Sequence, residues 1–202
     1  MPGQKIPEQE RREQILNAAM QVALRDGIGA VTVRAVAVQA GLSHALILFH
    51  FKRKETLLRA LLASLLSTVL AAPVAPSSSR RPALDRLRAL VRDEMTRLRA
   101  EPARVRLLLD SWALGARHPA LREQVTRAWQ AYRGAFRPVI EQTLSEHGRL
   151  ARGASVDGVA AFAVAIVNQC MVQELIDPEG FPRADYASTA DAAVGMLLGA
   201  AG

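Results

Sequence analysis

Apolar residues recur at intervals of three and four along most of the chain, which is the spacing that places them on one face of an α-helix. Between Glu8 and Arg25 this spacing predicts a first amphipathic helix, which Gly27 ends. A later helix is expected to begin near Lys54, where pairs of leucines recur every four residues. The segment 72–82 contains three prolines and three consecutive serines, and is therefore predicted to be a loop that divides the chain.

Five more helices are predicted after this loop, over about 83–100, 102–116, 119–147, 155–176 and 185–200. Pro102 and Pro119 fit the first turn of a helix, and Gly148 fits the end of one. With two short helices over 33–40 and 44–50, the total is about nine helices and no strand. The composition agrees, because only 4% of the residues are aromatic while Ala and Leu are abundant. The predicted fold class is all-α.

The segment from Thr32 to Phe51 has the features of a helix-turn-helix. Thr32 and Ser43 can cap the two short helices, and Gly41 can adopt the left-handed conformation of the turn between them. The residues suited to the seam between the helices are small or apolar: Val36, Ala37, Ala40, Leu42 and Ile47. On length and capping alone, an ordinary helical hairpin remains an alternative to DNA binding.

Extended to both sides, this segment resembles the tetracycline-repressor (TetR) family of bacterial transcription regulators. The matching stretches are REQILNAAMQVALRDG (12–27), TVRAVAVQAGLS (32–43) and FHFKRKETLLRAL (49–61). The resemblance implies a DNA-binding domain over 1–52 and a dimerising, ligand-binding domain over 53–202. The stretches WALGARHPALREQVTRAWQAYRGAF and VNQCMVQELIDP are similar to the BetI-like branch of the family, from which no ligand is carried over.

The second short helix is expected to enter the major groove of DNA. Arg34 lies in the first turn of the other helix, where backbone N–H groups and a guanidinium both favour phosphate; a solvated arginine beside a capping threonine is the alternative. Lys52 and Lys54 suit contacts with phosphate that do not depend on sequence. His44 is expected to contact the groove, and His50 to be packed and hydrogen-bonded. The residues expected at the DNA are Thr32, Arg34, Ser43, His44, Ala45, Leu46, Leu48, Phe49, His50, Lys52 and Lys54.

The expected recognition helix departs from the family pattern. Many members have the segment KGTLYYHF where this chain has HALILFHF. The tyrosine hydroxyl usually directed at a phosphate is absent at Leu48, and the threonine is replaced by Leu46. Because Leu46, Leu48 and Phe49 cannot all point inward, we expect apolar contacts with thymine methyl groups and an operator unlike that of better-known relatives.

Two features of the C-terminal part concern a small-molecule effector and a partner chain. Trp129, Tyr132 and Phe136 share one helix face, and together with Trp112 they are expected to line an effector pocket; an ordinary core stripe is the alternative. Small residues in the last two helices suit the close helix packing of a homodimer interface, with packing inside one chain as the alternative. These residues are Ala160, Ala161, Ala163, Ala165, Ala190, Ala192, Ala193 and Gly195.

Net charge and candidate chemistry narrow the function further. The 26 lysine and arginine residues and the 19 aspartate and glutamate residues give a formal net charge of +7 at pH 7, which permits polyanion binding. Cys170 is the only cysteine, so no internal disulfide can form. The N-terminus does not read as a signal peptide, and the uncharged stretch 158–173 is judged too short and too polar to span a bilayer. We therefore expect a cytoplasmic protein.

No catalytic motif, phosphate loop or dinucleotide fingerprint is found in the sequence, and neither His44 nor His50 has a second ligand at metal-binding spacing. We therefore expect no catalytic residues, no metal and no cofactor. The prediction is a homodimeric, ligand-responsive repressor that binds a pseudo-palindromic operator in double-stranded DNA. An all-α interaction or scaffold protein is the alternative, and a small-molecule-metabolising enzyme is disfavoured.

Overall fold

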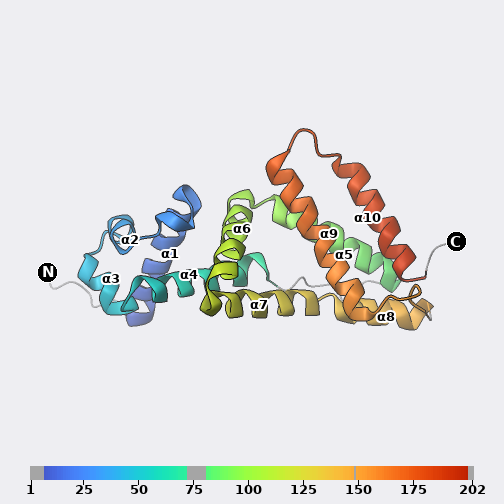
Figure 1. The fold of residues 1–202 in the computed structure, drawn as a ribbon, viewed down its shortest axis with the longest axis horizontal. Helices are drawn as coiled ribbons and strands as arrows, with labels where there is room; N and C mark the ends of the chain where they lie inside the picture. Colours follow the sequence, from blue (N-terminus) through green and yellow to red (C-terminus); the bar gives the residue numbers. More distant parts are fainter. Residues whose placement is uncertain (1–6, 72–80, 148, 200–202) are drawn as a thin grey trace. The chain divides into compact units, whose positions relative to one another are not determined.

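The computed structural model describes residues 7–71, 81–147 and 149–199, and over these residues the fold is all-α with no strand (Figure 1). A 3₁₀ helix, η1, was not predicted and follows the first α-helix. The elements are α1 (Glu8–Asp26), η1 (Ile28–Ala30), α2 (Val33–Ala40), α3 (His44–Phe51), α4 (Lys54–Val69), α5 (Ala83–Arg99), α6 (Pro102–Arg117), α7 (Pro119–Gly134), α8 (Arg137–His147), α9 (Val156–Ile176) and α10 (Arg183–Leu197). The expected fold class is confirmed. Most of the predicted loop, and Gly148, lie outside the described residues.

One predicted helix is wrong: the stretch 119–147 forms two helices, α7 and α8, and not one. The break follows Gly134, and Pro138 lies in the first turn of α8. In a continuous helix, the ring of Pro138 would clash with the carbonyl of Gly134, four residues earlier, and Pro138 has no N–H to donate to it. Starting a new helix at Arg137 places the proline where a missing N–H costs little.

The chain divides into two compact units. Unit 1 contains residues 1–69 and 106–126, and unit 2 contains residues 70–105 and 127–202. In unit 1, α1 packs against α2 and α4. The buried residues Ile15, Val36 and Ile47 lie in the core of this unit. The side-chain N–H of Gln124 also donates to the carbonyl of Arg59, 3.0 Å away, which joins the start of α7 to α4 within this unit.

In unit 2, α5 packs against α8, α9 and α10. Tyr132, Phe136 and Ile140 are fully buried in this unit, as are Leu87 and Leu198. The unit-2 core is therefore built from α5, the end of α7, and the three last helices.

Helix α9 is longer than the uncharged stretch 158–173 suggested. With 21 residues it is long and apolar enough to cross a membrane by length and composition alone. However, eight of its residues are buried, and α9 packs against α5, α8 and α10. This burial is what the central helix of a folded helical unit shows, so the length of α9 is weak evidence for a membrane span.

Candidate nucleic-acid interface

Helices α2 and α3 form the helix-turn-helix that the sequence predicts. Their axes differ by 111°, within the range found for such motifs. Gly41 ends α2 with φ of 64°, the left-handed conformation that glycine adopts without steric cost. The next N–H, of Leu42, donates to the carbonyl of Ala37 at 3.0 Å, which fixes the turn. Val36, Ala37 and Ile47 are buried at the seam.

Both helices begin at residues whose hydroxyls act as caps. The side-chain oxygen of Thr32 accepts the N–H of Ala35 at 3.0 Å, and that of Ser43 accepts the N–H of Leu46 at 3.2 Å. Thr32 and Ser43 are exposed, and an accepting hydroxyl keeps its own proton for donation. The capping that orients the helices therefore leaves these hydroxyls able to donate to a phosphate oxygen.

The outer face of α3 is more apolar than that of an ordinary exposed helix. His44 and Ala45 are exposed at its start, and Phe49 keeps 72% of its surface accessible. Leu46 and Leu48 are half-buried. Ile47 and Phe51 face the core of unit 1, whereas the other apolar side chains of α3 keep part of their surface accessible.

His50 is held at the end of α3 by its backbone. Its carbonyl accepts the guanidinium N–H of Arg12 at 2.5 Å, and its ring contacts the ring of Phe49 edge-on at 5.2 Å. The ring is packed, as expected. Its Nδ1, however, is buried without a hydrogen-bond partner among the described residues, so the hydrogen bond predicted for the imidazole is not seen at this nitrogen.

Two polar residues of α1 position the motif, and the sequence analysis missed both. The Arg12 guanidinium lies 4.4 Å from the centre of the Phe51 ring while it donates to His50. Two residues further along α1, the Gln14 amide donates to the carbonyl of Ala40, at the end of α2, at 3.2 Å. The only available signal was weak: both polar residues lie beside the apolar face of the predicted helix.

The chain reverses sharply between α3 and α4. Lys52 has φ of 62° and ψ of −49°, and the N–H of Arg53 donates to the carbonyl of Phe51 at 2.6 Å. This i to i+2 hydrogen bond around a residue with positive φ defines a γ-turn of the rare, strained kind. The turn leaves Lys52 exposed, beside the exposed Lys54 at the start of α4. Arg34, on α2, is exposed as well.

The strain at Lys52 predicts an unusual order of stability for two variants. Replacing Lys52 by Gly and by Ala removes the same charge, but only glycine tolerates this φ. We expect Lys52→Gly to have a free energy of unfolding about 1 kcal/mol above that of Lys52→Ala, since the relief of strain exceeds the entropy that glycine adds to the unfolded chain. Urea denaturation followed by circular dichroism measures both.

The matched control for this prediction is Lys54, which is exposed and helical. At this position glycine should be no more stable than alanine, since α4 needs no positive φ there. Equal stabilities of the two Lys52 variants would contradict the γ-turn.

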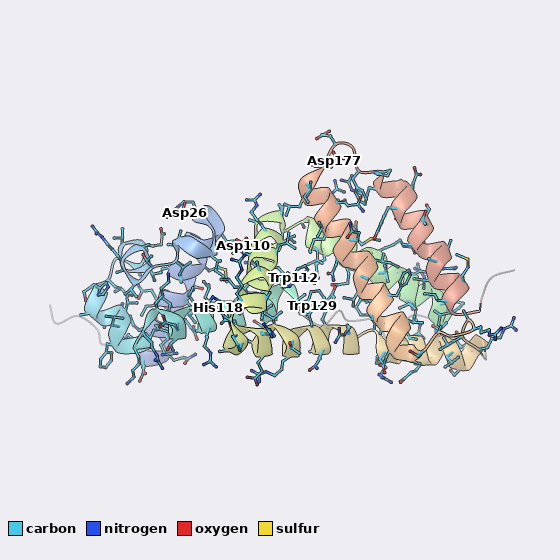
Figure 2. All side chains as sticks on the ribbon, viewed as in Figure 1. Asp26, Asp110, Trp112, His118, Trp129 and Asp177 are labelled. Atoms are coloured by element: carbon cyan, nitrogen blue, oxygen red, sulfur yellow. The ribbon has the colours of Figure 1, made fainter. Side chains whose placement is uncertain are left out.

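The aromatic residues expected at an effector pocket are divided between the units. Trp112 lies on α6 and Trp129 on α7 (Figure 2). Trp112 belongs to unit 1 and is half-buried, whereas Trp129, Tyr132 and Phe136 belong to unit 2. In unit 2 the three rings contact one another edge-on, with centres 5.9 Å apart for Trp129 and Tyr132 and 5.7 Å for Tyr132 and Phe136. They form a continuous aromatic stripe, of which only Trp129 is not fully buried.

A buried carboxylate contacts the middle residue of this stripe, Tyr132. Glu94 is only 4% exposed, and its Oε2 accepts the Tyr132 hydroxyl at 2.7 Å and the Arg97 guanidinium at 2.7 Å. Burial raises the pKa of Tyr132, and the nearby Glu94 carboxylate raises it further. Tyr132 therefore stays protonated as a hydrogen-bond donor. Sequence analysis missed Glu94, because on a charged helix it resembles any solvated glutamate.

Unit 2 also has two adjoining hollows. The larger one has a volume of about 560 Å³ and lies where α5 ends, α6 begins and the turn from α9 to α10 passes. The smaller one has a volume of about 320 Å³ and shares Arg99, Glu174 and Arg183 with the larger. The aromatic stripe lines neither of them. Among the described residues, no group of three or more His, Cys, Asp or Glu side chains is placed to hold a metal ion.

A capped helix-turn-helix with an open second helix, followed by a second helical unit, defines a DNA-binding regulator of the helix-turn-helix class. Two family models match the chain. Residues 15–61 match the N-terminal model of the bacterial regulatory proteins of the tetR family, and residues 83–199 match the C-terminal model of BetI-type transcriptional repressors. The chain therefore belongs to the TetR family of transcription regulators and has a BetI-type C-terminal domain. A search of curated proteins finds no match.

Solved structures share this fold. A protein of Pseudomonas aeruginosa PAO1 assigned as a transcriptional regulator superimposes with a TM-score of 0.76 at 19% identity, covering 96% of this chain and 93% of its own. Salmonella enterica GusR superimposes with a TM-score of 0.70 at 18% identity, covering 94% of this chain and 96% of its own. A transcriptional regulator of Rhodococcus sp. Rha1 superimposes with a TM-score of 0.71 at 21% identity, covering 93% of this chain and 96% of its own. Identities this low show the fold alone.

Proposed function

We propose that this regulator is a cytoplasmic repressor that binds a pseudo-palindromic operator as a homodimer and is released by a small-molecule effector. The observation that carries the proposal is the α2–α3 motif, in which the capping hydroxyls, the basic residue Arg34 and the side chain of Phe49 are all exposed, as are Lys52 and Lys54 directly after it. Hydroxyls, guanidinium and ammonium groups suit phosphate, and the apolar side chains suit thymine methyl groups. In the proposed complex, α3 of each chain enters one of two successive major grooves.

The proposed dimer surface is the outer face of α9 and α10. On α9 the exposed residues Phe162, Ala165, Gln169 and Ile176 recur at intervals of three, four and seven, which places them on one side of the helix. Phe162 is 41% exposed and Ile176 is 76% exposed, so this side of α9 presents two large apolar side chains. The exposed Ala192 and Met196 of α10 are four residues apart and share a side in the same way.

The small residues of these two helices serve two different purposes. Ala160, Ala163, Ala190 and Gly195 are buried, and allow the helices of one chain to approach closely. Ala161, Ala165 and Ala192 are exposed and available to a partner, while Ala193 is half-buried. A bulky substitution at Ala163 would therefore disturb folding of the unit, and Ala165 is the position that tests the dimer.

We place the effector pocket in unit 2, at Trp129, Tyr132 and Phe136, three of the four aromatic residues that the sequence suggests. The edge-on contacts along the unit-2 aromatic stripe and the partial exposure of Trp129 support this placement. Rigid aromatic side chains are typical of the walls of small-molecule sites. Release of DNA requires that the effector bind the two dimer conformations with different affinities.

The proposal predicts that the protein retards DNA flanking its own gene in a gel shift and leaves unrelated DNA of equal length free. In this assay Lys54→Ala should weaken binding and lower the slope of log affinity against log salt by about 1, because one phosphate contact is lost. Arg133→Ala removes one exposed charge from unit 2 and is the control, with no change in slope. Equal retardation of both DNAs at every salt concentration would refute operator binding.

A further inference from the structure

The two hollows of unit 2 have a continuous apolar floor. Leu98, Val105 and Met171 are buried beneath the larger hollow, and Met95 and Cys170 beneath the smaller one. The turn after α9, which carries Asp177, borders the larger hollow (Figure 2). We call the two together the α5–α9 cleft. Its floor and its volume suit the hydrocarbon part of a small molecule.

Two arginines of the cleft meet at one largely buried carboxylate, that of Glu174. Glu174 has a side chain only 9% exposed, and the guanidinium of Arg183 donates to it. Arg99 is a second cation at the same carboxylate, with its Nε 4.0 Å from the Glu174 oxygen, at the limit of an ion pair. Two guanidinium groups thus share one carboxylate. The Arg99 side chain is 56% exposed and can turn toward a ligand.

The cleft has two further charged residues, Arg92 and Glu179. Arg92 forms its own ion pair with Asp191, at 2.5 Å. Glu179 also lines the larger hollow, from the exposed turn that follows α9, so two arginines and two glutamates line it. Of the three arginines of the cleft, Arg99 has the longest ion pair and is therefore the one most able to turn toward a ligand.

We propose that the α5–α9 cleft binds a small organic anion, with its carboxylate on Arg99 and an apolar tail along the floor. A guanidinium binds a carboxylate in a two-pronged, charge-assisted geometry, which an alcohol cannot reproduce. A cationic ligand would have to displace an arginine from Glu174. This site is separate from the aromatic stripe and goes beyond the proposed function, because it holds whether or not the ligand releases DNA.

The test compares three ligands with the same eight-carbon tail: octanoate, octanol and octylamine. Isothermal titration of the full chain should show octanoate binding at least tenfold more tightly than the other two. Arg99→Gln should weaken octanoate binding about tenfold or more, the usual effect of losing a hydrogen bond between charged groups. Arg133→Gln, an exposed arginine elsewhere in unit 2, should leave it unchanged.

Cys170 reports where the ligand lies. It is the only cysteine and lines the smaller hollow, and burial raises the pKa of its thiol to about 11. At a fixed pH of about 8, where this thiol is mostly protonated, octanoate should slow alkylation of Cys170 by iodoacetamide in the wild type and in Arg133→Gln. It should have much less effect at the same concentration in Arg99→Gln.

Three results would overturn the site: equal octanoate affinity in the two arginine variants, octylamine binding as tightly as octanoate, or alkylation unaffected by saturating octanoate. The proposed function is tested separately in the gel shift. A protein that binds octanoate through Arg99 but retards no DNA would refute the operator proposal and leave the anion site standing.

Discussion

Replacing Ala165 by arginine should make the protein monomeric and weaken its binding to operator DNA by about 100-fold to 10,000-fold. The substitution places a charge in the middle of the exposed stripe on α9, between Phe162 and Gln169, where the proposed partner packs. An unpaired charge buried in an interface is expensive. Once the dimer is lost, each recognition helix binds its half-site alone. Linking two binding modules typically raises affinity by about 100-fold to 10,000-fold, so this is the loss expected.

The same substitution elsewhere gives the control. Ala131 is exposed on α7, within unit 2 and outside the proposed interface, so Ala131→Arg should remain dimeric and bind the operator normally. Sedimentation velocity gives the oligomeric state, and a gel shift gives the affinity. Circular dichroism should show that both variants keep their helices, because both positions face solvent. A dimeric Ala165→Arg protein with normal affinity would remove the outer face of α9 from the interface.

The sequence predicted those helices and turns whose ends are determined by residues close together in the chain. The capping hydroxyls of Thr32 and Ser43 and the left-handed Gly41 act within one helical turn, so the helix-turn-helix was predicted almost to the residue. The leucine pairs of α4 likewise predicted the side that is now buried. Pro138 is also a local signal, but the apolar spacing continues on both sides of it, and the α7–α8 break was not predicted.

The rest of the site depends on contacts between residues far apart in the chain. Arg12 reaches His50 across 38 positions, and nothing near Arg12 in the sequence distinguishes it from an ordinary surface arginine. Glu94 and Tyr132 are separated by the same interval. Periodicity predicted that Tyr132 faces inward, but it could not show which polar group would meet its hydroxyl. Such pairings follow from tertiary packing, which spacing along a helix does not encode.

The Glu94 cluster provides a second large effect, on stability. Replacing Glu94 by leucine should lower the free energy of unfolding by about 2–3 kcal/mol, because a buried hydroxyl that loses its acceptor costs about this much. Tyr132 is fully buried, so water cannot take the place of the carboxylate without a change in packing. The Arg97 side chain is 37% exposed and can turn to solvent, which makes the tyrosine the main source of the loss.

A double substitution isolates that source. Adding Tyr132→Phe to Glu94→Leu removes the stranded hydroxyl and leaves an apolar pair, which should recover about 1–2 kcal/mol, since replacing both partners of a buried hydrogen bond is often nearly neutral. In the wild-type background, Tyr132→Phe should instead destabilise, because it removes a hydrogen bond to a charged group. Tyr132→Phe should therefore destabilise the protein when residue 94 is glutamate and stabilise it when residue 94 is leucine. Urea denaturation monitored by circular dichroism measures all four proteins. A Tyr132→Phe substitution that destabilises equally in both backgrounds would show that the hydroxyl and the Glu94 carboxylate do not interact.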